Sequence, residues 1–147
     1  MHTDNNLIEN IFDWQHGAVP ATNTDIRRNI TADNLMILVS DIIIQLGIPV
    51  HVKGYTYLRE AIIIKVNDPQ ADMPVTKILY PDVAKKFYTS AGRVERAIRH
   101  AIEMAWTRMD CAYREQNFSY RLIRFEKKPT NSEFIAMIAE YIVLLYS

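Results

Sequence analysis

The sequence predicts an all-α protein, and three observations support this fold class. Of the 147 residues, 49% are hydrophobic and only 4 are glycine and 6 proline, so the chain can bury a core and contains few helix breakers. Apolar residues recur at the three- and four-residue spacing of a buried helix face. Helix-capping residues flank these stretches. We expect about six helices in one domain over residues 31–147, after a leader over residues 1–30 that contains a short amphipathic stretch.

The first two helices are expected in the N-terminal half of the domain. One follows Thr31 and ends at Gly47, because glycine is favoured just beyond a helix end. The second covers residues 55–66 and is terminated by Asn67-Asp68-Pro69. Residues 62–64 would also suit a short strand, but the apolar positions around them do not alternate, which favours a helix. The buried face of the first helix comprises Leu35, Leu38, Val39, Ile42 and Leu46.

A third helical region covers Val75 to Phe87 and is expected to bend or restart at Pro81, because proline suits the first turn of a helix. The next helix has Ser90 as its expected N-cap and the most regular apolar stripe in the chain. The stripe consists of Val94, Ala97, Ile98, Ala101, Ile102 and Ala105.

The C-terminal part combines one firm helix with a segment that is harder to interpret. Residues 130–133 read Thr-Asn-Ser-Glu, a capping-box pattern that opens the last helix. A short helix over residues 112–116 and an extended piece over 118–125 are expected before it. The last helix is expected to bury Phe134, Ile135, Ile138, Ile142 and Leu145.

Positive charge is concentrated in one third of the chain, although the net charge is zero. Residues 76–128 carry 12 basic and 6 acidic groups, net +6, whereas residues 1–75 carry 5 basic and 9 acidic groups, net −4. A local basic region in a neutral chain is typical of a phosphate-binding face.

A helix-turn-helix pattern lies inside this basic region. Residues 81–87 form its first helix, residues 88–90 its turn, and the striped helix its second helix. Ala84 has the small side chain that close helix packing requires, and Val94 follows it at the spacing of the residue that locks the second helix. The pattern predicts a DNA-reading unit.

The second helix presents basic residues opposite its apolar stripe, namely Arg93, Arg96, Arg99 and His100. Arginine forks match the paired acceptors of guanine, and Glu95 is able to accept a hydrogen bond from a cytosine amino group. Because the helix dipole disfavours a cation near the N-terminus, Arg93 suggests a task other than helix stability. The alternative is an ordinary solvated helix face.

Four separated stretches resemble one known family. They are Val52–Ile62, Leu79–Phe87, Arg93–Glu103 and Lys128–Met137. In this order they resemble the C-terminal effector domain of the stage-zero sporulation protein A, a response regulator of endospore formation, over about residues 33–140.

The resemblance implies an all-helical transcription regulator that binds double-stranded DNA at an operator box with a CG core, often as a tandem or head-to-tail dimer. The positions that match base-reading residues are Arg93, Glu95 and Arg96. Thr130, Asn131 and Ser132 would contact phosphate at a helix N-terminus. The further DNA-backbone candidates are Thr89, Ser90, Lys85, Lys86, Arg99, His100, Lys127 and Lys128.

The sequence departs from the family at three places. Thirty leading residues are too few for the family's receiver domain, so we expect DNA binding that does not depend on phosphorylation. Gly92 replaces a serine of the family and Tyr88 an asparagine, so a hydroxyl contact beside Arg93 is lost. Residues 109–127 diverge and are a candidate region for dimer or RNA polymerase contact.

Other functions find little support in the sequence. It contains no glycine-rich phosphate loop, its four histidines have no metal-binding spacing, and Cys111 has no evident partner, so neither an enzyme nor a cofactor is predicted. No secretion signal or membrane span is evident, and a cytoplasmic, nucleoid-associated protein is expected. The alternative function is an interaction protein that pairs with a full-length regulator or competes for its sites.

Overall fold

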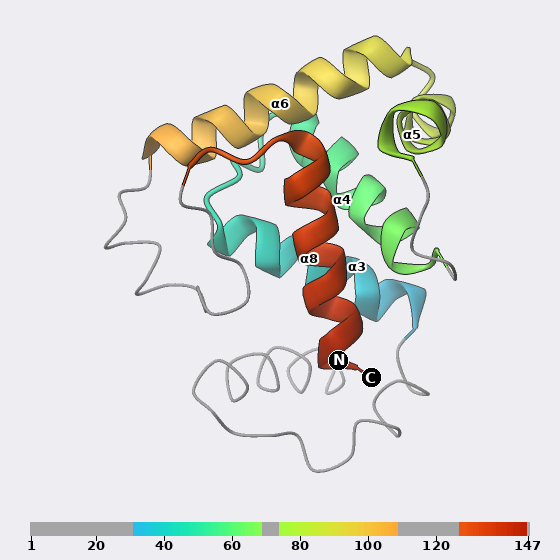
Figure 1. Ribbon diagram of the computed structural model, residues 1–147, viewed down its shortest axis with the longest axis vertical. Helices are drawn as coiled ribbons and strands as arrows, with labels where there is room; N and C mark the ends of the chain where they lie inside the picture. Colours follow the sequence, from blue (N-terminus) through green and yellow to red (C-terminus); the bar gives the residue numbers. More distant parts are fainter. Residues whose placement is uncertain (1–30, 69–73, 109–126, 147) are drawn as a thin grey trace.

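The computed structural model describes residues 31–68, 74–108 and 127–146. Within these ranges it is entirely helical, with five α-helices, one π-helical turn and no strand, which confirms the predicted all-α class. The leader and the expected elements at 112–116 and 118–125 lie outside the described residues. The elements, shown in Figure 1, are α3 (Ala32–Gln45), α4 (Lys53–Val66), η1 (Val75–Leu79), α5 (Tyr80–Lys86), α6 (Ala91–Arg108) and α8 (Asn131–Leu145).

Helix α4 lies at the centre and packs against α3, α6 and α8 (Figure 1). It begins at Lys53, two residues before the expected start, and ends at Val66 as expected. Leu58, Ala61 and Ile62 are fully buried on its inner face, so residues 62–64 belong to a helix and not to a strand. A helix that is covered by three others must bury apolar side chains over much of its circumference, which explains why its pattern looked ambiguous in the sequence.

The closest approach between α4 and α6 occurs at Gly54. A Cβ atom at this position would collide with the backbone carbonyl oxygen of Ala97 and would lie 2.8 Å from the Cβ of Ala101. Ala97 and Ala101 are themselves small, so three small residues allow the two backbones to approach. Gly54 therefore determines how closely α4 packs against α6, the helix that carries the basic side chains.

Most helix ends follow the predicted capping chemistry. The Thr31 hydroxyl accepts a hydrogen bond from the Asn34 N–H at 3.1 Å, which starts α3. Gly47 has a φ of 94° just beyond the C-cap Leu46, a conformation that glycine adopts without steric cost. The predicted restart near Pro81 is also confirmed, because the π-helical turn η1 leads into α5 and places the proline in the first turn.

The core is shared by all helices. It includes every residue predicted to face inward from the last helix, namely Phe134, Ile135, Ile138, Ile142 and Leu145. No described helix combines the length and the apolar character that a bilayer span requires.

Candidate nucleic-acid interface

Helices α5 and α6 are joined by a tight turn and form a helix-turn-helix. The Thr89 N–H donates to the Ala84 carbonyl at 2.9 Å, so the chain reverses within one turn of the end of α5. The Ser90 hydroxyl accepts from the Arg93 N–H at 3.3 Å and caps α6, as predicted. Ala84 and Val94 are both buried between the two helices and the core, which are the locations that the sequence spacing predicted for them.

The first half of α6 exposes its basic side chains. Val94 and Ile98 are fully buried, and this fixes Arg93, Arg96 and His100 on the outer surface. Within the described part of the chain neither Arg93 nor Arg96 has a hydrogen-bonded or ion-paired side chain. Two exposed arginines on one helix, with no side-chain partner among the described residues, are available to an external acceptor.

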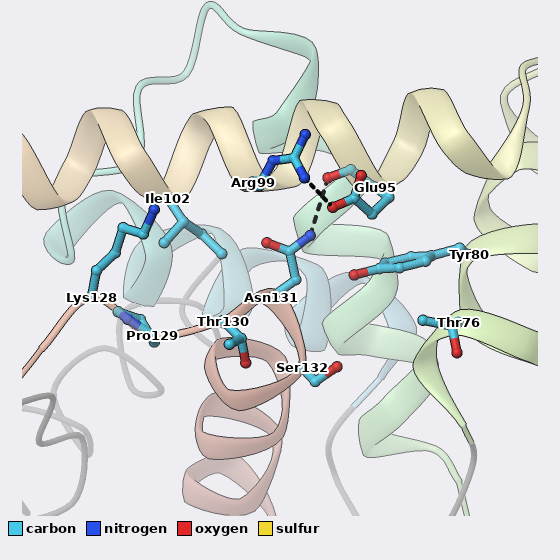
Figure 2. A pocket seen from close by; sticks show the side chains of 10 residues that line it. All are labelled: Thr76, Tyr80, Glu95, Arg99, Ile102, Lys128, Pro129, Thr130, Asn131 and Ser132. Atoms are coloured by element: carbon cyan, nitrogen blue, oxygen red, sulfur yellow. Dashed lines mark hydrogen bonds and ion pairs between the residues drawn. The ribbon is translucent and has the colours of Figure 1, made fainter.

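Glu95 and Arg99 lie on a different flank of α6, the one that faces the start of α8 (Figure 2). An Arg99 guanidinium nitrogen lies 3.0 Å from a Glu95 carboxylate oxygen, and both side chains remain partly exposed. The pair has the i, i+4 spacing of helix ion pairs, whose contribution to stability is small. Of the three predicted base-reading side chains, that of Glu95 has a partner among the described residues.

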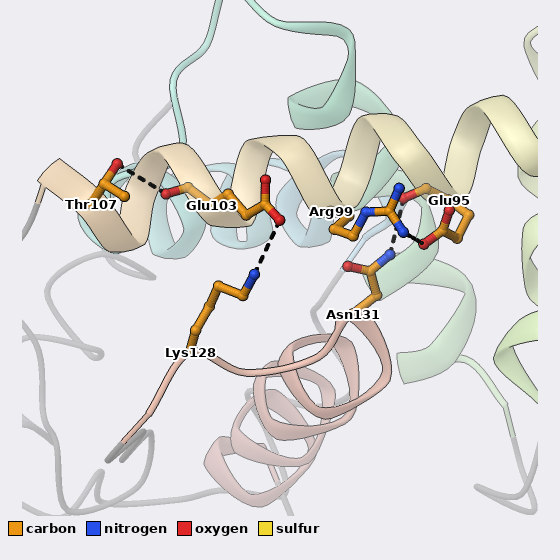
Figure 3. A network of polar contacts seen from close by, with 6 residues as sticks. All are labelled: Glu95, Arg99, Glu103, Thr107, Lys128 and Asn131. Carbon is orange, nitrogen blue, oxygen red and sulfur yellow. Dashed lines mark hydrogen bonds and ion pairs between the residues drawn. The ribbon is translucent and has the colours of Figure 1, made fainter.

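The N-terminus of α8 is built from the Lys-Pro-Thr-Asn-Ser block. The Thr130 hydroxyl accepts from the Glu133 N–H at 3.2 Å, and the Glu133 carboxylate accepts from the Thr130 N–H at 3.2 Å. This confirms the capping box, and the hydrogen bond from the Thr130 N–H to the carboxylate is the main cause that lowers the pKa of Glu133. The Asn131 amide donates to the Glu95 backbone carbonyl at 3.0 Å and ties α8 to α6 (Figure 3). Ser132 is exposed.

Two of the three residues predicted to bind phosphate thus use their side chains within the protein. The capping box uses the backbone N–H groups of Thr130 and Glu133, so those of Asn131 and Ser132 remain the groups suited to an anion at this helix start.

A pocket of about 350 Å³ lies between this helix start and α6 (Figure 2). Tyr80 forms part of its wall, and burial raises the pKa of that phenol, an effect that the nearby Asn131 side chain partly offsets. Tyr80 and Thr76 were not among the residues predicted from the sequence. The signal for Tyr80 was its helical spacing with Val83 and Ala84, which places it on the buried face of α5. The lining residues are Thr76, Tyr80, Glu95, Arg99, Ile102, Lys128, Pro129, Thr130, Asn131 and Ser132.

Two of the four candidate lysines are held by carboxylates. The Lys86 Nζ atom lies 2.9 Å from a carboxylate oxygen of Glu60 in α4. Lys128 lies 3.0 Å from Glu103 of α6, and this contact lowers the pKa of Glu103 (Figure 3). Lys85 and Lys127 are exposed. Because these pairs join residues far apart in the sequence, a pattern of local charges does not reveal them.

An all-helical domain with a helix-turn-helix and an arginine-bearing second helix defines a DNA-binding class of protein. Residues 39–142 match the family model described as Sporulation initiation factor Spo0A C terminal. The chain belongs to this family of DNA-binding transcription-regulator domains of sporulation, which confirms the resemblance found in the sequence.

Proposed function

We propose that this protein regulates transcription by binding double-stranded DNA sequence-specifically, with the first half of α6 in the major groove. The observation that supports this best is a pair of exposed arginines, Arg93 and Arg96. They lie at the start of α6, the second helix of the helix-turn-helix. The N-terminal residues of such a second helix are the ones that reach base edges.

In this proposal Arg93 and Arg96 donate to the N7 and O6 acceptors of guanines in a CG-containing box. Glu95 accepts from the amino group of a cytosine. To do so its carboxylate rotates away from Arg99, whose guanidinium then turns toward a phosphate. The exchange costs little, because a partly exposed ion pair contributes little to stability.

Backbone contacts surround this base-reading centre. The side chains assigned to phosphate are Lys85, Lys86, Thr89, Ser90, Arg99, His100, Lys127, Lys128 and Ser132, with the α8 N–H groups of the block that contains Thr130 and Asn131. A homodimer on tandem boxes, which the family resemblance implies, is part of the same proposal. So is a contact with RNA polymerase.

The decisive experiment is selection of bound duplexes from a random DNA pool by the full chain. We expect enrichment of one short motif that contains CG. A matched control is Arg108→Ala, which removes an exposed arginine from the far end of α6 and should leave the selected motif unchanged. A pool that stays random after several rounds would contradict sequence-specific binding and would favour the interaction or competitor protein.

Lys85 offers a test of the phosphate contacts. Replacing it by alanine should weaken binding to the selected motif and to unrelated duplexes alike, because a phosphate contact carries no sequence information. The slope of log K against log salt should fall in magnitude by about one unit, since one fewer counterion is released. Titrations at several salt concentrations measure both quantities, and a loss confined to the selected motif would exclude this role.

A further inference from the structure

Tyr88, in the turn of the helix-turn-helix, combines two unusual properties. Its side chain is 98% exposed. Its backbone has a φ of 55°, and it is the one described residue other than glycine with a positive φ. Large aromatic side chains usually bury most of their surface, and residues with a Cβ atom rarely adopt the left-handed conformation.

Neither folding nor packing explains a tyrosine at this position. The neighbouring Phe87 does serve packing, because it is partly buried and its ring centroid lies 5.4 Å from that of Tyr57. The Tyr88 ring is almost completely exposed and therefore adds no burial. Glycine or asparagine would adopt the left-handed conformation more easily. Glycine or asparagine at this position would therefore give a more stable fold than tyrosine does.

The position of Tyr88 indicates a use outside the fold. It follows Lys85 and Lys86 at the end of α5 and precedes Ser90 and Arg93 at the start of α6. When the start of α6 enters the major groove, the turn in front of it lies at the edge of that groove, beside a phosphate strand. Tyrosine hydroxyls are among the groups that donate to DNA phosphate oxygens.

We propose that Tyr88 binds the DNA backbone at the edge of the groove, with its phenol O–H donating to a phosphate oxygen. This inference rests on the proposed function and adds a contact to it. Because an O–H donor brings no positive charge to the phosphate, the contact releases no cation from DNA, unlike a lysine contact. Its loss therefore lowers affinity without changing the salt slope.

The test compares two variants, Tyr88→Phe and Tyr88→Asn, with the full-length wild-type chain. Tyr88→Phe should bind about tenfold more weakly to the selected motif and to unrelated duplexes, with an unchanged salt slope. Tyr88→Asn should lose at least as much affinity and yet unfold at a higher temperature, because asparagine suits the left-handed conformation. A purely structural residue would not move these two quantities in opposite directions.

Tyr55→Phe is the matched control, since it removes a phenol oxygen from α4 outside the turn and should leave DNA affinity unchanged. Wild-type affinity in both Tyr88 variants would overturn the phosphate contact alone. A reduced salt slope in Tyr88→Phe would overturn the neutral-donor chemistry. Absence of duplex binding by the wild-type chain would overturn the proposed function, and the contact with it.

Discussion

Replacing Gly54 by alanine is expected to lower the free energy of unfolding by roughly 3 kcal/mol, at the upper end of what overpacking usually costs. The new methyl group would collide with the Ala97 carbonyl oxygen, which is backbone and has no rotamer to change. Either α4 or α6 has to shift, and both contribute to one core. Thermal or denaturant unfolding of the purified variant measures the loss.

Gly92→Ala is the matched control for this substitution. Gly92 also lies in a helix, but a Cβ atom there would meet no atom within 4 Å. Alanine at this position should therefore be neutral or raise stability by up to about 1 kcal/mol, because of its better helix propensity. Equal effects of the two substitutions would show that helix propensity, and not the α4–α6 approach, determines the result at Gly54.

Replacing Arg96 by alanine is expected to weaken binding to the selected motif by about 1–3 kcal/mol and to relax the preference at one guanine. The fold should not suffer, because the side chain is exposed and makes no hydrogen bond or ion pair with any described residue. Affinity for a panel of single-base variants of the motif, with unfolding measured in parallel, checks both expectations.

Arg96→Lys separates charge from geometry. Lysine keeps the positive charge but lacks the planar fork that engages the N7 and O6 of guanine together. The salt slope should therefore stay close to that of the wild-type chain while the preference at the guanine falls. If Arg96→Ala retains the wild-type preference at every base, the assignment of Arg96 to a base is wrong.

The sequence predicted the helices well, because the evidence for a helix is local. The apolar stripe and the Ser90 cap located α6, and the Thr130–Glu133 box located α8. Distances between helices are not local. The apolar pattern favoured a helix where α4 lies, but it did not show that Gly54 touches the backbone of α6.

The candidate site shows the same division. Exposure of Arg93 and Arg96 followed directly from the helical phase of Val94 and Ile98. The use of the Asn131 side chain as a bridge to Glu95 did not, because it depends on how α8 docks 36 residues later in the chain. Pairing of Lys128 with Glu103 depends on the same docking.

Helix α6 is a single uninterrupted element of 18 residues, and this continuity restricts how its length is able to vary. Each residue turns an α-helix by about 100°, so one inserted residue after Arg96 would rotate the preceding turn relative to everything that follows. The arginines would then face a new direction while Arg99 and Glu103 kept their places beside α8. A single insertion or deletion between Arg96 and Arg99 would therefore separate the direction of the arginines from the docking of α6 on α8.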